Sequence, residues 1–466
     1  MTSAGKPPRL IVVSNRVAPI TEGEPTAGGL AVGVLDALKA QGGIWFGWSG
    51  EVSAEAEPVV HAGQTIGAIT VITMDLSRHD YDEFYRGFAN GALWPVLHYQ
   101  IGLSKFDWAD FAGYRRVNQL FARALIPLLR PDDVIWAHDY HLLCLAEGLR
   151  TAGVTNRIGL FLHTPFPEPG VLMTMPAHAE LVRAICSFDL AGFQTEADRT
   201  AFTDYVCRHA DGSTHPDGSL TAYGLSPRTG VYPIGVHIDE ARAEAVHPVH
   251  RRQALRLRDN LRGRPLIISV DRLDYSKGLR QRFLAVERFL QDNANGQVVF
   301  MQIAPPSRSD VQTYREIRRE LEAEAGRING RFADVDWVPL RYLNRSFPRT
   351  ALMSLYAEAH VGLVTPLRDG MNLVAKEFIA AQNPDEPGVL VLSQFAGAAV
   401  ELSAALVVNP YDEAAVATAL EQALSMGLEE RKRRHGALIA VMRRNSLDAW
   451  RDRFLADLGS ETIRST

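Results

Sequence analysis

Short, uninterrupted apolar runs alternate with longer segments of helical pattern along nearly the whole chain. A run without polar residues predicts a strand that is covered on both faces, because a half-exposed strand alternates apolar and polar residues. Parallel sheets between two layers of helices meet this condition. The predicted strands are residues 10–13, 134–136, 158–162, 266–270, 298–303, 361–364 and 389–392. The chain is therefore predicted to be an α/β protein.

The strand–helix rhythm is interrupted once, which predicts two domains. A chain of 466 residues is too long for one ordinary core. Polar, helix-prone sequence follows residue 235, and the rhythm restarts at residue 266. We expect one α/β domain over residues 1–238, a second over 239–445, and a cleft between them. The helix predicted within residues 446–466 is expected to pack back on the first domain.

Composition excludes several classes of function. A formal charge of -5 and a pI near 6.3 give no electrostatic footprint for nucleic acid. Apolar content of 46% without a signal peptide or membrane-length run predicts a cytoplasmic globular protein with no membrane partner. Cys144, Cys186 and Cys207 are expected to be buried, inert thiols. Histidines and carboxylates show no metal-ligand spacing, so we predict no metal site and no cofactor.

Two cations follow the predicted strand 266–270, five positions apart. Arg272 and Lys277 lie in a turn at the carboxyl end of that strand, where open α/β sheets bind their ligands. A pair of cations there suits a doubly negative group, most commonly a nucleotide diphosphate. The alternative is a surface turn with two solvated charges.

Polar or small residues also follow other predicted strands. Arg16 comes after the first strand, and Gly28 and Gly29 then open a helix whose N–H groups can meet a phosphate or sugar. His163 follows another strand and is a candidate active-site imidazole. Arg308 ends a further strand and suits a phosphate monoester. An ordinary turn and a histidine without function remain the alternatives for the glycine pair and for His163.

A second helix start carries similar chemistry. Asp369 and Gly370 make a tight turn, and the free N–H groups of the helix that follows can hold hydroxyls or phosphate. Glu377 lies on the helix face that can point back to the cleft, where its carboxylate can accept hydrogen bonds from ribose hydroxyls. A helix cap and a solvated carboxylate are the alternatives. Aromatic residues near glycine at 43–50 and 84–95 suit sugar rings, although core packing accounts for some of them.

Nine segments recur in the order of a known family. They are Ser14–Arg16 with Gly28–Leu30, Phe46–Trp48, Leu93–Pro95, His138–His141, His163–Pro167, Gly192–Thr195, Arg272–Gly278 and Asp369–Val374. From about residue 9 to 458 the chain closely resembles the trehalose-6-phosphate synthase family, the retaining glycosyltransferases of family 20. The resemblance implies the GT-B fold, in which two Rossmann-like domains face each other across a cleft. It also implies transfer of glucose from UDP-glucose to glucose 6-phosphate, and a homo-oligomer, either a dimer or a tetramer.

The resemblance further implies roles for individual residues. In the donor site, Arg272 and Lys277 hold the diphosphate, and Gly28 and Gly29 line the sugar and diphosphate. The other implied donor contacts are Phe347 through its backbone on uracil, Asp369 on the transferring glucose, and Leu373, Val374, Ala375, Lys376 and Glu377, with Glu377 on the ribose. The implied acceptor site consists of Arg16, Trp48, Tyr85, Trp94, Asp139 and Arg308, with Arg16 and Arg308 on the phosphate. His163 matches the imidazole that approaches the 6-hydroxyl of the donor sugar. Arg272, Lys277, His163 and Asp369 form the implied catalytic set.

The expected mechanism is substitution on the front face of the donor sugar, because no carboxylate nucleophile for double displacement is indicated. Three alternatives to this function remain. The first is a relative with another acceptor or donor, such as a glucosylglycerol-phosphate synthase or a pseudo-glycosyltransferase that joins cyclitols. The second is a non-catalytic sugar-phosphate sensor. The third, suggested by the glycine pair alone, is a nicotinamide dehydrogenase. The sequence leaves open which nucleotide base the donor carries.

Overall fold

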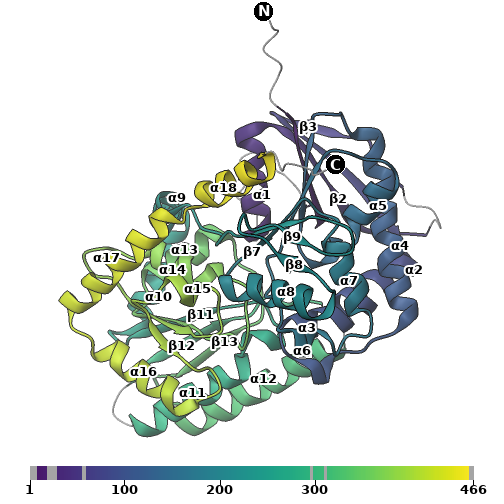
Figure 1. The fold of residues 1–466 in the computed structure, drawn as a ribbon. Helices are drawn as coiled ribbons and strands as arrows, with labels where there is room; N and C mark the ends of the chain where they lie inside the picture. Colours follow the sequence, from purple (N-terminus) through teal and green to yellow (C-terminus); the bar gives the residue numbers. More distant parts are fainter. Residues whose placement is uncertain (1–7, 18–28, 55–58, 294–296, 309–311, 461–466) are drawn as a thin grey trace, which may run out of the picture. The chain divides into compact units, whose positions relative to one another are not determined.

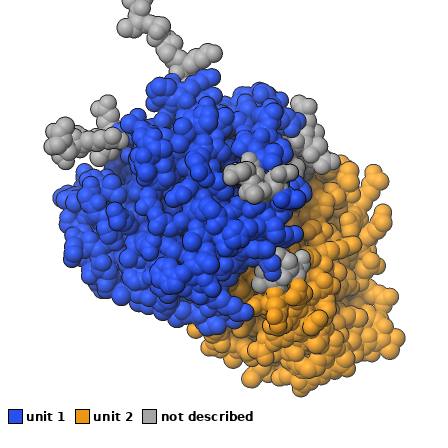
Figure 2. All heavy atoms as spheres, turned by 90° about the vertical axis from the view of Figure 1, so that its right-hand side faces the viewer, with its two compact units in different colours: residues 1–233, 448–466 blue, residues 234–447 orange. Residues whose placement is uncertain are grey.

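The computed structural model describes residues 8–17, 29–54, 59–293, 297–308 and 312–460, apart from the side chains of residues 29–32. The chain divides into two compact units, coloured separately in Figure 2. Unit 1 comprises Met1–Pro233 and Asp448–Thr466, and unit 2 comprises Ile234–Leu447. Each unit contains a largely parallel sheet with helices, so the predicted α/β class is confirmed (Figure 1).

Unit 1 is built on an eight-stranded sheet of order β10-β7-β6-β5-β1-β2-β4-β3, in which only β3 runs antiparallel. Its strands are β1 Leu10–Arg16, β2 Gly43–Ser53, β3 Gln64–Ile66, β4 Ile69–Ser77, β5 Val134–His138, β6 Arg157–Phe161, β7 Leu190–Phe193 and β10 Arg228–Val231. A separate hairpin consists of β8 Ser213–Thr214 and β9 Leu220–Thr221. Because β1 lies between β5 and β2, the residues that follow these strands meet at one edge of the sheet.

The strand predicted at residues 10–13 is confirmed, but it continues through polar residues to Arg16. Ser14 is fully buried, and its Oγ accepts a hydrogen bond of 2.8 Å from Nε1 of Trp45. Ser14 also pairs with His138 across the ladder. A buried hydroxyl with a partner costs little, so the sheet extends beyond its apolar segment.

The helical elements of unit 1 are α1 Gly29–Gln41, α2 Arg78–Asp80, η1 Tyr81–Leu93, α3 Trp94–Leu97, η2 Ile101–Leu103, α4 Trp108–Leu125, η3 Ile126–Leu128, η4 Tyr140–Leu142, α5 Leu145–Thr151, α6 Pro169–Leu172, α7 His178–Ile185 and α8 Glu196–His209. Helix α18, Leu447–Gly459, comes last in the sequence but lies beside α1 (Figure 1). Nη1 of Arg451 and Oδ2 of Asp36 form an ion pair of 2.6 Å between these two helices.

Helix α18 covers the sheet where the strands carry glycine. The ring of Phe454 stacks on Trp136 of β5, with centroids 4.8 Å apart. A Cβ at Gly192 of β7 would lie 2.7 Å from the Phe454 ring, and one at Gly159 of β6 would lie 2.8 Å from Leu458. The two glycines therefore make room for the aromatic and aliphatic residues of α18.

Unit 2 is built on a six-stranded, fully parallel sheet of order β13-β12-β11-β14-β15-β16. Its strands are β11 Leu266–Val270, β12 Val299–Ile303, β13 Leu340–Leu343, β14 Val361–Val364, β15 Val389–Ser393 and β16 Leu406–Val408. Its helical elements are α9 Ile238–Ala245, α10 Pro248–Leu261, η5 Tyr275–Lys277, α11 Leu279–Asp292, α12 Gln312–Phe332, α13 Arg349–Ala357, α14 Leu373–Ala381, α15 Ala398–Glu401, α16 Glu413–Ser425 and α17 Leu428–Arg444.

Both faces of the unit 2 sheet are covered, as continuous apolar strands require. Val361 and Leu363 of β14 belong to the buried core that α11, α12 and α16 share. Between them, Gly362 faces the other way, since a Cβ there would lie 2.7 Å from the ring of Phe378 on α14. Helix α14 packs in turn against α9 and α13. The strand predicted at 361–364 is confirmed without change.

The expectation that all three cysteines are buried is wrong for Cys207. Cys144 and Cys186 are buried, and burial raises the pKa of each thiol to about 12. Cys207 lies on the exposed face of α8, where solvent and not the core surrounds the thiol. Among the described residues, no helix combines the length and the apolarity needed to cross a bilayer.

Replacing Phe454 with alanine is predicted to lower the free energy of unfolding of unit 1 by about 3–5 kcal/mol. The substitution removes a ring that is fully buried against Trp136 and Gly192 and leaves a cavity. Denaturant unfolding followed by circular dichroism measures the change. Ala456→Ser, at an exposed position of the same helix, is the control and should cost less than about 0.5 kcal/mol. Equal midpoints for the two variants would contradict the packing role of α18.

Candidate active site

The turn after β11 carries the two cations that the sequence singled out. Arg272 is exposed, whereas Lys277 is 8% exposed and ends the short helix η5. Gly278 follows with a φ of 66°, and a Cβ there would lie 2.5 Å from the carbonyl oxygen of Thr365. Only glycine fits this position, because both the backbone conformation and the close approach exclude a side chain. The turn is therefore held tightly against the end of β14.

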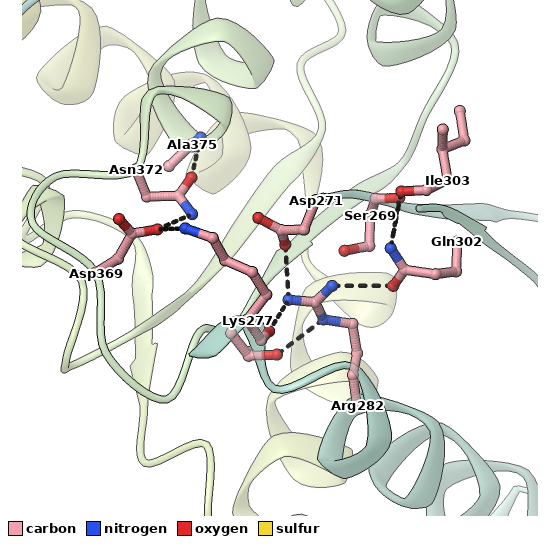
Figure 3. Close-up of polar contacts among 10 residues, drawn as sticks. Ser269, Asp271, Lys277, Arg282, Gln302, Ile303, Asp369, Asn372 and Ala375 are labelled. Atoms are coloured by element: carbon pink, nitrogen blue, oxygen red, sulfur yellow. Dashed lines mark hydrogen bonds and ion pairs between the residues drawn. The ribbon is translucent and has the colours of Figure 1, made fainter. Parts of the chain in front are cut away.

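A fully buried guanidinium, that of Arg282 on α11, lies behind this turn (Figure 3). Its Nη2 donates to Oδ2 of Asp271 at 2.9 Å and to the carbonyl oxygen of Lys277 at 3.0 Å. Its Nη1 donates to Oε1 of Gln302 at 2.9 Å, and its Nε donates to Oγ1 of Thr365 at 3.1 Å. Burial raises the pKa of Asp271 and lowers that of Arg282, so each charge depends on the other. The backbone of Lys277 is thereby fixed against the ends of β11, β12 and β14.

Lys277 and Asp369 form an ion pair at the start of α14. Nζ of Lys277 lies 2.5 Å from Oδ2 of Asp369, and Nδ2 of Asn372 donates to the same oxygen at 3.0 Å (Figure 3). Oδ1 of Asn372 accepts from the N–H of Ala375 at 3.2 Å and caps the helix. Asn372 has a φ of 77°, which is uncommon for a residue other than glycine. One network thus connects an ammonium, a carboxylate and a helix start.

The first turn of α14 presents its backbone more than its side chains. Leu373 and Val374 are half-buried. The side chain of Lys376 is fully buried, donates from Nζ to the carbonyl oxygen of Ile234 at 2.5 Å and pairs with Glu401. N–H groups at the start of a helix lack intrahelical acceptors and favour anions. Lys376 can therefore contact a ligand through its backbone, because its ammonium is already engaged.

The residues expected near the base and ribose have partners of their own. Oε1 of Glu377 accepts from Nε of Arg349 at 3.2 Å, and Nη1 of Arg349 donates to Glu244 at 2.6 Å. Burial raises the pKa of Glu377, and the guanidinium of Arg349 opposes this effect. Phe347 is half-buried before α13, with the guanidinium carbon of Arg345 4.5 Å from its ring centroid.

Arg308 lies after β12 and is linked to the Lys277 turn. Its Nη1 donates to Oδ2 of Asp274 at 3.1 Å and to the hydroxyl of Tyr314 at 2.5 Å. The Tyr314 hydroxyl donates to the same carboxylate oxygen at 2.9 Å. The other oxygen of the buried Asp274 accepts from the N–H of Ser276 at 2.9 Å. Asp274 therefore positions the guanidinium of Arg308 and the backbone of η5 at once.

In unit 1, Arg16 at the end of β1 pairs with Trp48, which lies in the middle of β2. The guanidinium carbon of Arg16 lies 5.9 Å from the Trp48 ring centroid, a cation–π distance. Gly50 has a φ of 96°, and a Cβ there would lie 2.5 Å from Nε of Arg16. Nε1 of Trp48 donates to the carbonyl oxygen of Glu51 at 2.7 Å. The indole is fixed, and glycine leaves space for the guanidinium.

Tyr85 belongs to η1, a π-helix of 13 residues, and Trp94 follows this helix directly. Such helices are rare and are often found at functional sites. The ring of Tyr85 lies 5.5 Å from that of Trp48 and stacks on His141 at 5.9 Å with an interplanar angle of 12°. Trp94 is buried and packs on Tyr140 at 5.3 Å. Arg16, Trp48 and Tyr85 therefore form one aromatic and cationic surface, the unit 1 cluster.

Asp139 and His163 meet at the ends of β5 and β6. Asp139 has a φ of 74°, a strained backbone for a non-glycine residue. Its Oδ1 accepts from the N–H of His163 at 3.2 Å, and its own N–H donates to the carbonyl oxygen of Phe161 at 2.8 Å. Nε2 of His163 lies 3.1 Å from Nδ1 of His138. Burial lowers the pKa of His163 to about 3 and that of His138 well below its usual value, so both rings are neutral at neutral pH.

The glycine pair is described only in part. Gly28 lies outside the described residues, and Gly29 is the first residue of α1. The helix start predicted there is confirmed for Gly29.

Sequence reasoning missed the buried polar residues that hold these groups in place. Arg282, Asp274 and Asn372 were not assigned to the site, although each contacts a residue that was. Arg282 left a signal, because it occupies an apolar-face position of α11 between Leu279 and Val286. A charge on a buried helix face needs a buried partner, which is Asp271 here.

Comparison with known proteins gives one consistent result. The model of glycosyltransferase family 20 matches residues 9–460. The trehalose-6-phosphate synthase of Enterobacter sp. (strain 638) is 52% identical over 459 residues, which are 98% of this chain and 96% of that protein.

Solved structures agree with this result. A UDP-forming α,α-trehalose-phosphate synthase from Burkholderia xenovorans, in complex with glucose-6-phosphate, has a TM-score of 0.93 at 53% identity, covering 97% of this chain and 100% of that one. The E. coli protein bound with UDP-2-fluoro glucose has a TM-score of 0.93 at 50% identity, covering 97% and 99%. The fold is shared, and the predicted GT-B class is confirmed.

Replacing Arg282 with methionine is predicted to lower the free energy of unfolding of unit 2 by about 3–5 kcal/mol, because it leaves the carboxylate of Asp271 buried without its partner. Adding Asp271→Leu should recover part of this loss, since the double variant no longer buries a charge. Denaturant unfolding of the single and double variants measures the coupling. Arg280→Ala, on the same helix as Arg282, removes an exposed ion pair with Glu320 of α12 and should cost less than about 1 kcal/mol. If the double variant lost the sum of the unfolding free energies that the two single variants lose, Arg282 and Asp271 would not be coupled as a buried pair.

Proposed function

The chain belongs to glycosyltransferase family 20, and on that premise we propose that it transfers glucose from UDP-glucose to glucose 6-phosphate. The products are α,α-trehalose 6-phosphate and UDP, with retention at the anomeric carbon. The observation that carries the proposal is the network of Lys277, Asp369 and Asn372 at the start of α14. The proposal assigns the Lys277 ammonium to a diphosphate and the neighbouring Asp369 carboxylate to a sugar hydroxyl.

The donor contacts follow from this network. Arg272 and Lys277 neutralise the diphosphate, and N–H groups of the first turn of α14 add partial positive charge. Asp369 binds a hydroxyl of the transferring glucose. The remaining donor contacts are the backbone of Phe347 on uracil, Glu377 on the ribose, Gly28 and Gly29 near the sugar, and Leu373, Val374, Ala375 and Lys376 through their backbone. The relative bound with UDP-2-fluoro glucose supports a uridine nucleotide as the donor.

The acceptor contacts come from the cationic and aromatic residues described above, together with Asp139. Arg16 and Arg308 bind the phosphate, for which a guanidinium fork is well suited. Trp48, Tyr85 and Trp94 pack against the sugar ring, and Asp139 accepts from a hydroxyl. The relative in complex with glucose-6-phosphate supports this acceptor.

The reaction breaks the bond between the anomeric carbon and the β-phosphate oxygen of the donor. A bond forms on the same face to the anomeric hydroxyl oxygen of glucose 6-phosphate, and the hydroxyl proton moves to the departing phosphate oxygen. Charge develops on that phosphate in an oxocarbenium-like transition state, where fixed cations are most effective. The roles of Arg272 and Lys277 are therefore electrostatic.

Product analysis tests the reaction directly. The protein is incubated with glucose 6-phosphate and with UDP-, GDP- or ADP-glucose in turn, with glycerol 3-phosphate added as a competing acceptor. We expect trehalose 6-phosphate as the product, with UDP-glucose as the best donor. A glucosylglycerol phosphate as the main product would replace the proposed acceptor, and binding of both substrates without turnover would indicate a sensor.

That the protein is a cytoplasmic homo-oligomer remains a prediction from the sequence.

Arg272→Ala and Lys277→Ala are each predicted to lower kcat by about two to four orders of magnitude, because each removes a few kcal/mol of charge stabilisation from the transition state. Steady-state release of UDP measures the effect. Arg280→Ala, which removes an exposed cation three positions beyond Lys277, is the matched control and should retain kcat. Near-normal turnover of either alanine variant would remove that residue from the mechanism.

A further inference from the structure

His138 and His163, at the ends of β5 and β6, share a hydrogen bond whose donor and acceptor can be assigned. We propose that His138 is a positioning residue that donates a hydrogen bond from Nδ1 to Nε2 of His163 and so keeps the proton of His163 on Nδ1. The inference rests on the proposed function, in which His163 meets the 6-hydroxyl of the donor glucose. It goes further by stating which ring nitrogen carries the hydrogen.

The geometry of the pair is well defined. Nδ1 of His138 and Nε2 of His163 lie 3.1 Å apart, which is a hydrogen-bond distance with room for one proton between them. His138 is fully buried, and its backbone pairs in the ladder with Ser14 and Phe161 on either side. Its ring packs on Trp136 with centroids 4.5 Å apart. The ring of His138 is thus a rigid support for His163.

The direction of the bond follows from the second nitrogen of His138. Among the described residues, Nε2 of His138 is buried and has no hydrogen-bond partner. If Nδ1 accepted the bond, the proton of the neutral ring would lie on Nε2, as a buried N–H without an acceptor. Orphaned buried N–H groups are rarer than unpaired acceptor lone pairs, because the N–H forfeits its whole hydrogen bond. The proton therefore lies on Nδ1, and Nδ1 donates.

The same arrangement determines what His163 can do. Since both rings are neutral, His163 carries one proton, and its Nε2 is occupied as an acceptor. Its Nδ1 then carries the proton and can donate to a hydroxyl oxygen. The backbone N–H of His163 donates to Oδ1 of Asp139 at 3.2 Å, so both the backbone and the ring of His163 are fixed. His138 acts through His163 and does not touch the substrate.

A substrate-analogue cycle tests the positioning role. UDP-glucose and UDP-6-deoxyglucose are compared as donors for the wild type, His138→Leu and His138→Asn, with His215→Leu on the exposed β8–β9 hairpin as the control. We expect His138→Leu to lower kcat/KM for UDP-glucose about tenfold, as loss of one hydrogen bond predicts, and to leave UDP-6-deoxyglucose nearly unchanged. His138→Asn offers an amide donor near the position of Nδ1 and should restore most of the loss. Equal losses for both donors would show a merely structural role and overturn the proposal.

Nitrogen chemical shifts test the tautomer without any substrate. In protein labelled with 15N-histidine, signals of His163 are assigned by their absence from His163→Gln. We expect Nδ1 of His163 at a protonated position and Nε2 at an unprotonated one, with the pattern lost in His138→Leu. A protonated Nε2 would overturn the proposal. If the wild type forms no trehalose 6-phosphate, the proposed function fails, whereas the shifts still decide the direction of the bond.

Discussion

One buried charge supports the geometry of unit 2, namely the guanidinium of Arg282. A guanidinium without solvent costs several kcal/mol unless nearly all of its donors find acceptors. Here a carboxylate, an amide, a hydroxyl and a main-chain carbonyl fulfil that need. Three of these acceptors, on Asp271, Gln302 and Thr365, lie at or next to the ends of three neighbouring strands, and through Arg282 they set the position of the Lys277 carbonyl. The ammonium that pairs with Asp369 therefore starts from a rigid backbone.

The two units use different physics for their polar edges. Unit 2 relies on charges in networks, in which Lys277, Arg308 and Glu377 each have a partner of opposite sign. Such partners keep the cations in place before a ligand arrives, which lowers the entropy lost on binding. Unit 1 relies on rings, with Trp48, Tyr85 and His141 in successive contact. Fixed charge suits phosphate, and ring faces suit the C–H edges of a sugar, while Arg16 against Trp48 adds one guanidinium to the rings of unit 1.

Much of the fold could be predicted from the sequence, because buried parallel strands leave an unmistakable apolar pattern. The strands at 266–270 and 361–364 match the structure, and the helix of Trp450 and Phe454 was expected. Residues that follow strands, such as Arg272 and His163, could also be predicted, since sheet topology places them. The π-helix η1 could not, because no local pattern distinguishes it from an α-helix. The supports of the site, Arg282 and Asp274, were missed. The position of Arg282 on an apolar helix face indicates a buried charge, but its partner Gln302, and the partner Arg308 of Asp274, are distant in the sequence and are identified only by tertiary packing.

Helix α18 has a consequence for how the chain acquires its structure during synthesis. Trp136, Gly159 and Gly192 form an apolar face that α18 covers with Phe454 and Leu458. On the ribosome this face emerges early, whereas α18 emerges after the whole of unit 2. The nascent first unit therefore exposes a hydrophobic surface until α18 is synthesised, and such surfaces favour aggregation and are bound by chaperones. A ribosome that stops before α18 releases a polypeptide whose second unit is complete but whose first is not.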